Sequence, residues 1–371
     1  MADDKALTPF ITAVRRNCNI SDAGGSSIFS ICGMALRLRD LNKWEQGLPP
    51  WAEEDPDRLL GWIDKREQAW DSIVGTVGEN QFEPLSLGGK TFDPFDTPGL
   101  NRMLAPLGLF YGAGYARSLK PTFFLAEIRE TRDIDGIPVM VLGRELARDL
   151  LTIPALNQDG AVVFRREAAR LFLWDQMAYL KKSGQRFLSF ALRNCGLPDT
   201  GRESRITYFE SILAAQEPTY LYHETGELRD RVLARETFRE IVSQFPHSPV
   251  ELLVRTVKDL LADTGPCGTL AHIISTGNTA GLGFYAAFQD GLFRPMFPEL
   301  RMAAEKFVSD RDWAGIEQAK AKGFHTAKAY AHDLLALFQE GRDNGDMDRA
   351  GASINERLVR PLTDGQREAG T

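Results

Sequence analysis

The segment SPVELLVRTVKDLLADTGP, residues 248–266, carries the strongest structural signal in the chain. Ser248 can cap a helix, Pro249 suits the first helical position, and Glu251 completes a capping box. The apolar residues that follow repeat with the period of a half-buried helix: Val250, Leu253, Val254, Val257, Leu260 and Leu261. Because Gly265 and Pro266 then end the pattern, the segment predicts one amphipathic helix lying against a core.

Helical patterns also dominate the rest of the chain, which predicts a mainly α fold. They occupy residues 26–45, 56–74, 165–182, 203–215, 227–245, 298–308 and 324–338. Residues 123–129 and 137–142 instead favour β-strands, and Asp135-Gly136 between them is typical of a hairpin turn. An isolated hairpin is marginally stable in water, so it must pack on helices or join further strands, for example at 161–164. We therefore expect a multi-helix assembly with a small β-hairpin or small sheet around residues 122–143.

A chain of 371 residues is long enough to form two or three compact parts. We expect an N-terminal helical region over residues 1–200 that contains the hairpin, and a C-terminal helical region over 201–342. Residues 84–99 are rich in proline and glycine and predict either a linker or a lid over a site. Hydrophobic residues thin out after residue 342, so residues 343–371 are expected to form a flexible tail.

Composition excludes several classes of protein. Hydrophobic residues make up 43% of the chain and charged residues 26%, which is ordinary globular usage. A net charge of −7 makes nucleic acid a poor partner, and neither a signal peptide nor a membrane-spanning apolar run is recognisable. We therefore expect a cytoplasmic protein without a membrane partner. The cysteines, at positions 18, 32, 195 and 267, lack a Cys-x-x-Cys pair and are interpreted as idle thiols.

A glycine-containing string, TGNTAGLG at residues 276–283, looks like the dinucleotide loop of short-chain dehydrogenases. That family places the loop at its first strand and carries a Tyr-x-x-x-Lys pair downstream. Here only residues 284–371 follow the string, and they contain no such pair. NAD is therefore disfavoured and no cofactor is predicted. We interpret the glycines as a break between closely packed helices.

Residues 19–27 offer a first candidate ligand site. A loop of small residues there leads into a predicted helix, whose amides could hold an anion with the hydroxyls of Ser26 and Ser27 as further donors. Asp22 in the same loop is a third candidate ligand-binding residue. Ordinary helix capping explains the same residues and is the favoured interpretation. Cys18, close to Arg15 and Arg16, could similarly be a reactive thiol, although an inert cysteine is favoured.

The segment YLYHETGE, residues 220–227, offers a second candidate, with His223, Glu224 and Glu227 as ligand-binding residues. If the segment is helical, His223 and Glu227 lie one turn apart on one face. They could then share a metal ion, or act as a base with its orienting carboxylate. Alternatively, Thr225 and Gly226 mark a helix start, and Glu227 in the first turn is explained by the helix dipole.

Several strings resemble a family of uncharacterised bacterial proteins: NCNISD at 17–22, FSICGMALRLRDL at 29–41, KWE at 43–45, VKDLLAD at 257–263 and LGFY at 282–285. The resemblance implies a bacterial, non-secreted protein and supplies no activity.

Two functions stay open on the sequence. We favour a non-catalytic interaction protein that binds a protein partner, or forms a homo-oligomer, through helical faces and the tail. The alternative is an enzyme or a small-ligand or metal-binding protein. Its polar pocket would lie near His223 and Glu227 or near the helix start at residues 22–27.

Overall fold

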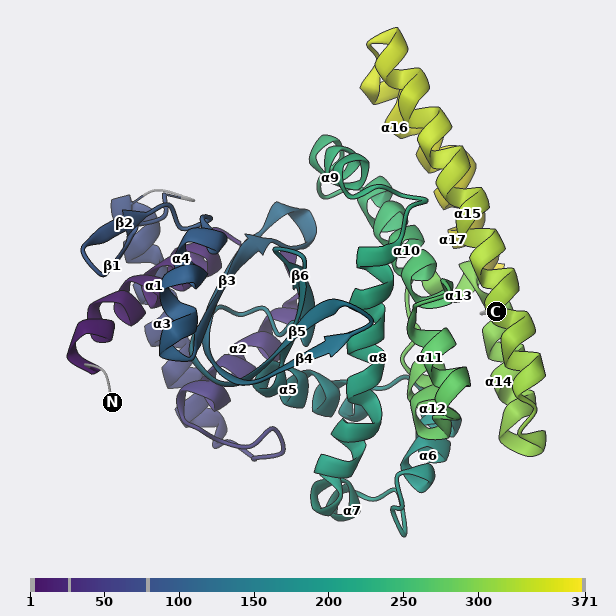
Figure 1. Ribbon diagram of the computed structural model, residues 1–371, viewed down its shortest axis with the longest axis horizontal. Helices are drawn as coiled ribbons and strands as arrows, with labels where there is room; N and C mark the ends of the chain where they lie inside the picture. The colour runs from purple at the N-terminus through teal and green to yellow at the C-terminus, as the bar shows by residue number, and fades with distance from the viewer. Residues whose placement is uncertain (1–3, 26–27, 78–80, 369–371) are drawn as a thin grey trace. The chain divides into compact units, whose positions relative to one another are not determined.

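The computed structural model describes residues 4–25, 28–77 and 81–368, and most of them are helical (Figure 1). The expected mainly α class is confirmed. The chain forms two compact units, Met1–Asp175 and Gln176–Thr371. This division lies before the expected one at residue 200, because α6 (Gln185–Asn194) packs against α12 (Thr279–Ala287) of the second unit.

The first unit combines helices with two sheets. Its helices are α1 (Asp4–Gly24), α2 (Ile31–Glu45), α3 (Pro56–Val77), α4 (Thr97–Leu104) and α5 (Arg166–Ala178). A two-stranded sheet consists of β1 (Leu85–Leu87) and β2 (Lys90–Phe92). A five-stranded sheet consists of β3 (Leu109–Tyr115), β4 (Pro121–Ile134), β5 (Ile137–Arg148), β6 (Ala155–Gln158) and β7 (Ala161–Arg165). The β-structure is thus more extensive than the hairpin alone.

The predicted hairpin forms the centre of the larger sheet, in which the strand order is β3-β4-β5-β7-β6. Strands β4 and β5 pair up to Ile134 and Ile137, and Asp135 and Gly136 between them both have positive φ, as a tight hairpin turn requires. Strand β7 adds to β5 in parallel, and the other neighbours are antiparallel. Three register shifts along β4 and β5 bend the sheet.

Alternate residues of β4 serve two separate cores, as the two-residue period of a strand dictates. Phe123 and Leu125 pack with Phe10 and Val14 of α1, whereas Phe124 belongs to a second cluster formed by strand residues. Residues 84–99, expected to be a linker or lid, instead contain β1, β2 and the start of α4. They are held in place because Leu85 and Leu87 are buried in the same core as α1.

The second unit is helical. Its remaining helices are α7 (Arg202–Thr207), α8 (Phe209–Arg229), α9 (Arg235–Gln244), α10 (Pro249–Thr264), α11 (Thr269–Thr276), α13 (Phe293–Met296), α14 (Pro298–Asp310), α15 (Trp313–Asn344), α16 (Met347–Ile354) and α17 (Arg360–Glu368). Among the helices that the structure describes in either unit, none combines the length and the apolar character that a bilayer crossing requires.

Helix α10 occupies the segment that the capping pattern of residues 248–266 predicts, and its predicted ends are confirmed. The Ser248 hydroxyl accepts a hydrogen bond from the Glu251 amide, while the Glu251 carboxylate accepts one from the His247 amide. The helix ends at Gly265. It packs against both α8 and α15, which leaves nearly all of its apolar residues buried.

The approach of α8 to α10 depends on Gly226, which is buried inside α8. A Cβ atom at this position would collide with the backbone carbonyl of Ala262 in α10. Lys258 holds the two helices together near the same level, because its ammonium pairs with Asp230 at 2.9 Å. It also donates to the carbonyl of Glu227. A residue without a side chain is therefore a packing requirement here.

The segment after residue 342 does not form the expected flexible tail in its described part. Helix α15 continues to Asn344, and α16, a π-helical turn at Asn355–Val359 and α17 follow. Ala350, Ile354 and Leu358 are buried, and Gly351 lies against Phe245. The sparse apolar residues are thus spaced so that one face of each helix is covered.

Substituting Gly226 with alanine is expected to destabilise the second unit by about 1–3 kcal/mol, because the added methyl group forces α8 and α10 apart. Gly315→Ala in α15 is the matched control, since its Cβ meets only a side-chain oxygen at 3.5 Å. The control should be neutral or stabilising by about 0.4–1 kcal/mol. Urea unfolding followed by circular dichroism measures both, and equal midpoints would show that the close approach is not required.

Candidate metal centre

Helix α8 presents His223 and Glu227 one turn apart on the same face. The alternative in which Thr225 and Gly226 begin a helix is wrong. Both residues lie within α8, and the Thr225 hydroxyl donates to the Leu221 carbonyl one turn earlier. The sequence alone suggested that Gly226 marks a helix boundary. The glycine is instead required by the contact with Ala262.

Helix α10 supplies Asp259 and Asp263, which are also one turn apart and face the same place. His223 Nε2 lies 3.8 Å from Asp259 Oδ1 and 4.0 Å from Glu227 Oε1. One ligand atom from each of these three residues lies within 4.8 Å of the others. Two helices that pack through Gly226 thereby place one imidazole and two carboxylates around a common point.

Asp263 fixes the orientation of the histidine ring. Its Oδ1 lies 2.9 Å from His223 Nδ1 and accepts a hydrogen bond from the Thr269 hydroxyl at 2.6 Å. Its Oδ2 accepts from the Tyr285 hydroxyl at 2.9 Å. Both oxygens of Asp263 act as acceptors, so His223 donates to Asp263 through its Nδ1–H group, and Nε2 is directed toward Glu227 and Asp259. A carboxylate behind a metal-binding histidine commonly plays this part.

The electrostatics of the cluster are those of crowded negative charge. Burial raises the pKa of Asp259 to about 7, although His223 opposes the shift. Burial, and then repulsion from Glu227, raise the pKa of the neighbouring Glu224 to about 8. Burial alone would lower the pKa of His223, but the charge and hydrogen bond of Asp263 raise it well above its usual value. The neighbouring carboxylates thus add to the effect of burial at Asp259 and Glu224, and they overcome it at His223.

Size and access suit a metal ion with open coordination positions. Ligand bonds of about 2.0–2.1 Å in a tetrahedral zinc site place ligand atoms roughly 3.3 Å apart. Small side-chain movements therefore suffice to close the present spacing. The side chains of His223 and Glu227 are each 27% exposed and that of Asp259 is 46% exposed. Three protein ligands on a solvent-accessible face leave positions for water or a substrate, which is the arrangement of catalytic rather than structural sites.

The other predicted ligand residues do not join this centre. Asp22 lies in the last turns of α1 rather than ahead of a helix. Its carboxylate pairs with buried Lys120 at 3.2 Å and accepts from the Leu150 amide. Burial raises the pKa of Asp22 to about 6 against the charge of Lys120, and the pair joins α1 to the sheet. Ser26 and Ser27 lie outside the described residues.

Cys18 is buried on α1, and its thiol donates to the Phe123 carbonyl. Burial raises the pKa of this thiol well above its usual value, which disfavours the reactive thiolate.

The glycine-containing string at 276–283 connects α11 to α12 and therefore follows a helix, not a strand. Gly277 ends α11 with a positive φ, and Asn278 caps α12 by accepting from the Gly281 amide. A Cβ at Gly283 would press on Ala191 of α6. These positions are those of glycines that join and pack helices.

Sequence reasoning missed Asp259, Asp263, Thr269 and Tyr285. Asp259 and Asp263 are four residues apart in the helix predicted over residues 248–266, so their shared face was visible in the sequence. Asp263 is almost fully buried, and an acidic residue on the buried side of an amphipathic helix is a usable signal. The spacing of these residues within α10 does not predict that α8 packs against them, because that contact arises from the tertiary structure.

Family models match both units of the chain. The N-terminal domain model of a family of unknown function (DUF6866) matches residues 9–165, and the C-terminal domain model of that family matches residues 170–357. No curated protein and no solved structure matches the chain significantly.

The Asp263→Asn substitution is expected to lower the pKa of His223, because it removes the charge that raises this pKa and leaves the opposing effect of burial. Proton NMR titration of the imidazole signals measures the change. The chain has five histidines, so the other four serve as internal references. An unchanged His223 titration curve would contradict the role given to Asp263.

Proposed function

Since the chain belongs to this family of unknown function, membership supplies no activity, and we propose one from the site: the protein binds a divalent transition-metal ion through His223, Glu227 and Asp259. The ion keeps at least one exchangeable position, at which it polarises water or a substrate oxygen. Such an ion lowers the pKa of its bound water and thereby supports hydrolytic chemistry near neutral pH.

The orientation of His223 carries the proposal. A buried carboxylate holds Nδ1, two further donors hold that carboxylate, and Nε2 points at two carboxylates from different helices. A chance cluster of surface acids needs no such support behind its histidine. The arrangement matches a ligand set with its orienting partners already in place.

The ligand types limit the choice of metal. One imidazole with two carboxylates suits Zn²⁺, Mn²⁺ or Fe²⁺, whereas Ca²⁺ and Mg²⁺ prefer oxygen ligands alone. We expect Zn²⁺ and Mn²⁺ to bind more tightly than Mg²⁺. Partner binding through helical faces, the favoured function on the sequence, stays a prediction and is compatible with a metal centre.

Replacing His223 with alanine should abolish stoichiometric binding of Zn²⁺ or Mn²⁺. Isothermal titration calorimetry of metal-free protein with each metal alone measures it. His332→Ala is the matched control, because His332 is 84% exposed on α15 and lies outside the cluster. The control should bind like the wild type. Absence of binding by the wild type, or equal losses in both variants, would refute the site.

Metal should also stabilise the second unit, since the ion joins α8 to α10 only in the folded state. At a free metal concentration 100 times the Kd, the expected gain is about 2.7 kcal/mol. The shift of the thermal unfolding midpoint with added Zn²⁺ measures it.

The Asp263→Asn variant should bind the metal about 10- to 100-fold more weakly than the wild type, as expected for a residue that orients a ligand.

Exchangeable coordination positions can be tested separately. With Co²⁺ in place of the native ion, the visible absorption bands should shift when azide is added. A spectrum insensitive to azide would indicate a closed, structural site.

A further inference from the structure

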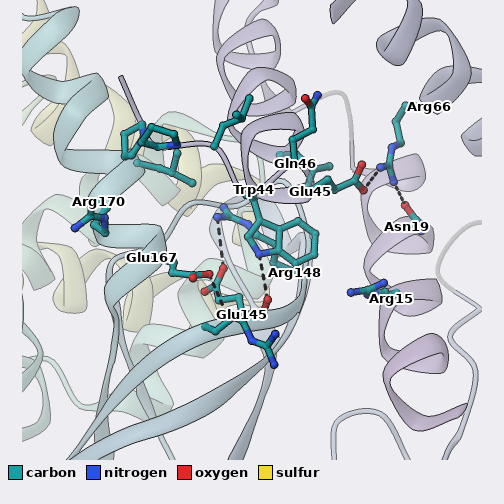
Figure 2. A pocket seen from close by; sticks show the side chains of 17 residues that line it. Arg15, Asn19, Trp44, Glu45, Gln46, Arg66, Glu145, Arg148, Glu167 and Arg170 are labelled. Carbon is teal, nitrogen blue, oxygen red and sulfur yellow. Dashed lines mark hydrogen bonds and ion pairs between the residues drawn. The ribbon is translucent and has the colours of Figure 1, made fainter. Parts of the chain in front are cut away.

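The first unit contains a cavity of about 970 Å³ that the metal centre does not involve. Its wall is formed by α1, α2, α3, β5, α5 and the loop at residues 46–50 (Figure 2). This volume lies at the upper end of those that take small molecules. The wall contains five arginines and three glutamates, so positive charge prevails in a chain whose net charge is −7.

Internal ion pairs neutralise most of the negative charge on the wall. Glu45 pairs with Arg66, and Glu145 pairs with Arg165 at 2.7 Å behind the wall and with Arg148 at 3.4 Å. Burial raises the pKa of the third carboxyl, Glu167, which accepts a hydrogen bond from the Glu145 amide. Because five arginines stand against three glutamates, the wall keeps an excess of positive charge.

Arg15 supplies the guanidinium best placed to receive an anion. Its Nε donates to the Leu146 carbonyl at 2.8 Å, which anchors the side chain, and its Cζ lies 6.0 Å from the centre of the Trp44 ring. Among the described residues, no carboxylate pairs with Arg15. Figure 2 shows it on α1 without a bond to another wall residue drawn. Its terminal nitrogens are therefore available as donors.

Arg148 supports the wall from behind, because its side chain is 0% exposed. Its Nε donates to the Asp149 carbonyl and its Nη2 to the Thr152 hydroxyl, and its Nη1 lies 3.4 Å from Glu145 Oε2, which balances its charge. Trp44 is fixed by donating to the Glu145 carbonyl and offers a flat apolar surface beside the charges.

We propose that this cavity binds a phosphate-bearing small molecule of about mononucleotide size. The phosphate lies against Arg15, and the rest of the molecule lies along Trp44 and the loop at 46–50. Arginine is the residue best suited to phosphate, because its planar fork donates two parallel hydrogen bonds. The site lies in a different unit from the metal centre, so either can exist without the other.

The test is calorimetric titration of the full-length, metal-free protein with inorganic pyrophosphate and with adenosine 5′-monophosphate. Adenosine is the uncharged control. Arg15→Gln should weaken binding of both phosphate probes at least about tenfold, the loss expected for one charge-assisted hydrogen bond. Because Arg15 is exposed, this variant should fold, which circular dichroism checks.

Arg16→Gln is the matched control. Arg16 is the next residue of α1, is also exposed, pairs with Glu83 and is absent from the cavity wall. It should bind both probes as the wild type does, and so should His223→Ala, which separates this site from the metal centre. The proposal is overturned if neither phosphate probe binds at millimolar concentration. It is also overturned if adenosine binds as well as its monophosphate, or if Arg15→Gln and Arg16→Gln lose binding equally.

Discussion

The close approach of α8 and α10 determines what the second unit can do. Gly226 lets the two backbones meet at the Ala262 carbonyl. Gly268 also lies against this carbonyl, and a Cβ there would collide with it as well. The axes of packed helices usually lie about 8–10 Å apart. A side chain as short as aspartate then reaches the facing helix only where the two backbones come into contact, as they do at Gly226. The site of His223 and Asp259 thus follows from a packing constraint set by residues that have no functional groups.

Each candidate site holds an excess of charge of one sign, which costs folding stability unless something compensates for it. In the second unit, Asp263, Thr269 and Tyr285 hold the histidine, and Lys258 secures the neighbouring end of α8. In the first unit, a network of Glu145 with Arg148 and Arg165 fixes the cavity wall. Unfavourable charge that is held in place by surrounding hydrogen bonds and ion pairs is typical of binding sites, where a ligand of opposite charge completes the interactions.

The sequence allowed the local structure to be predicted well wherever one residue pattern decided it. The ends of α10 followed from Ser248 and Gly265, and the hairpin turn followed from Asp135-Gly136. The failures have tertiary causes. Gly226 looked like a helix boundary because a glycine required by a facing helix cannot be told from one that ends a helix. Parts of the two proposed sites, His223 with Glu227 and Arg15, stood in the sequence, but their partners on α10 and β5 are brought in by packing alone.

The burial of α10 has a consequence for the motions of the protein. Its backbone is enclosed by α8 and α15, so its amides should exchange with solvent only through the largest opening of the second unit. Exposed ends of the longer helices can fray at far smaller energetic cost. Asp259 and Asp263 therefore lie on the helix that we expect to open last in this unit, which should keep these two carboxylates in place while helix ends fray.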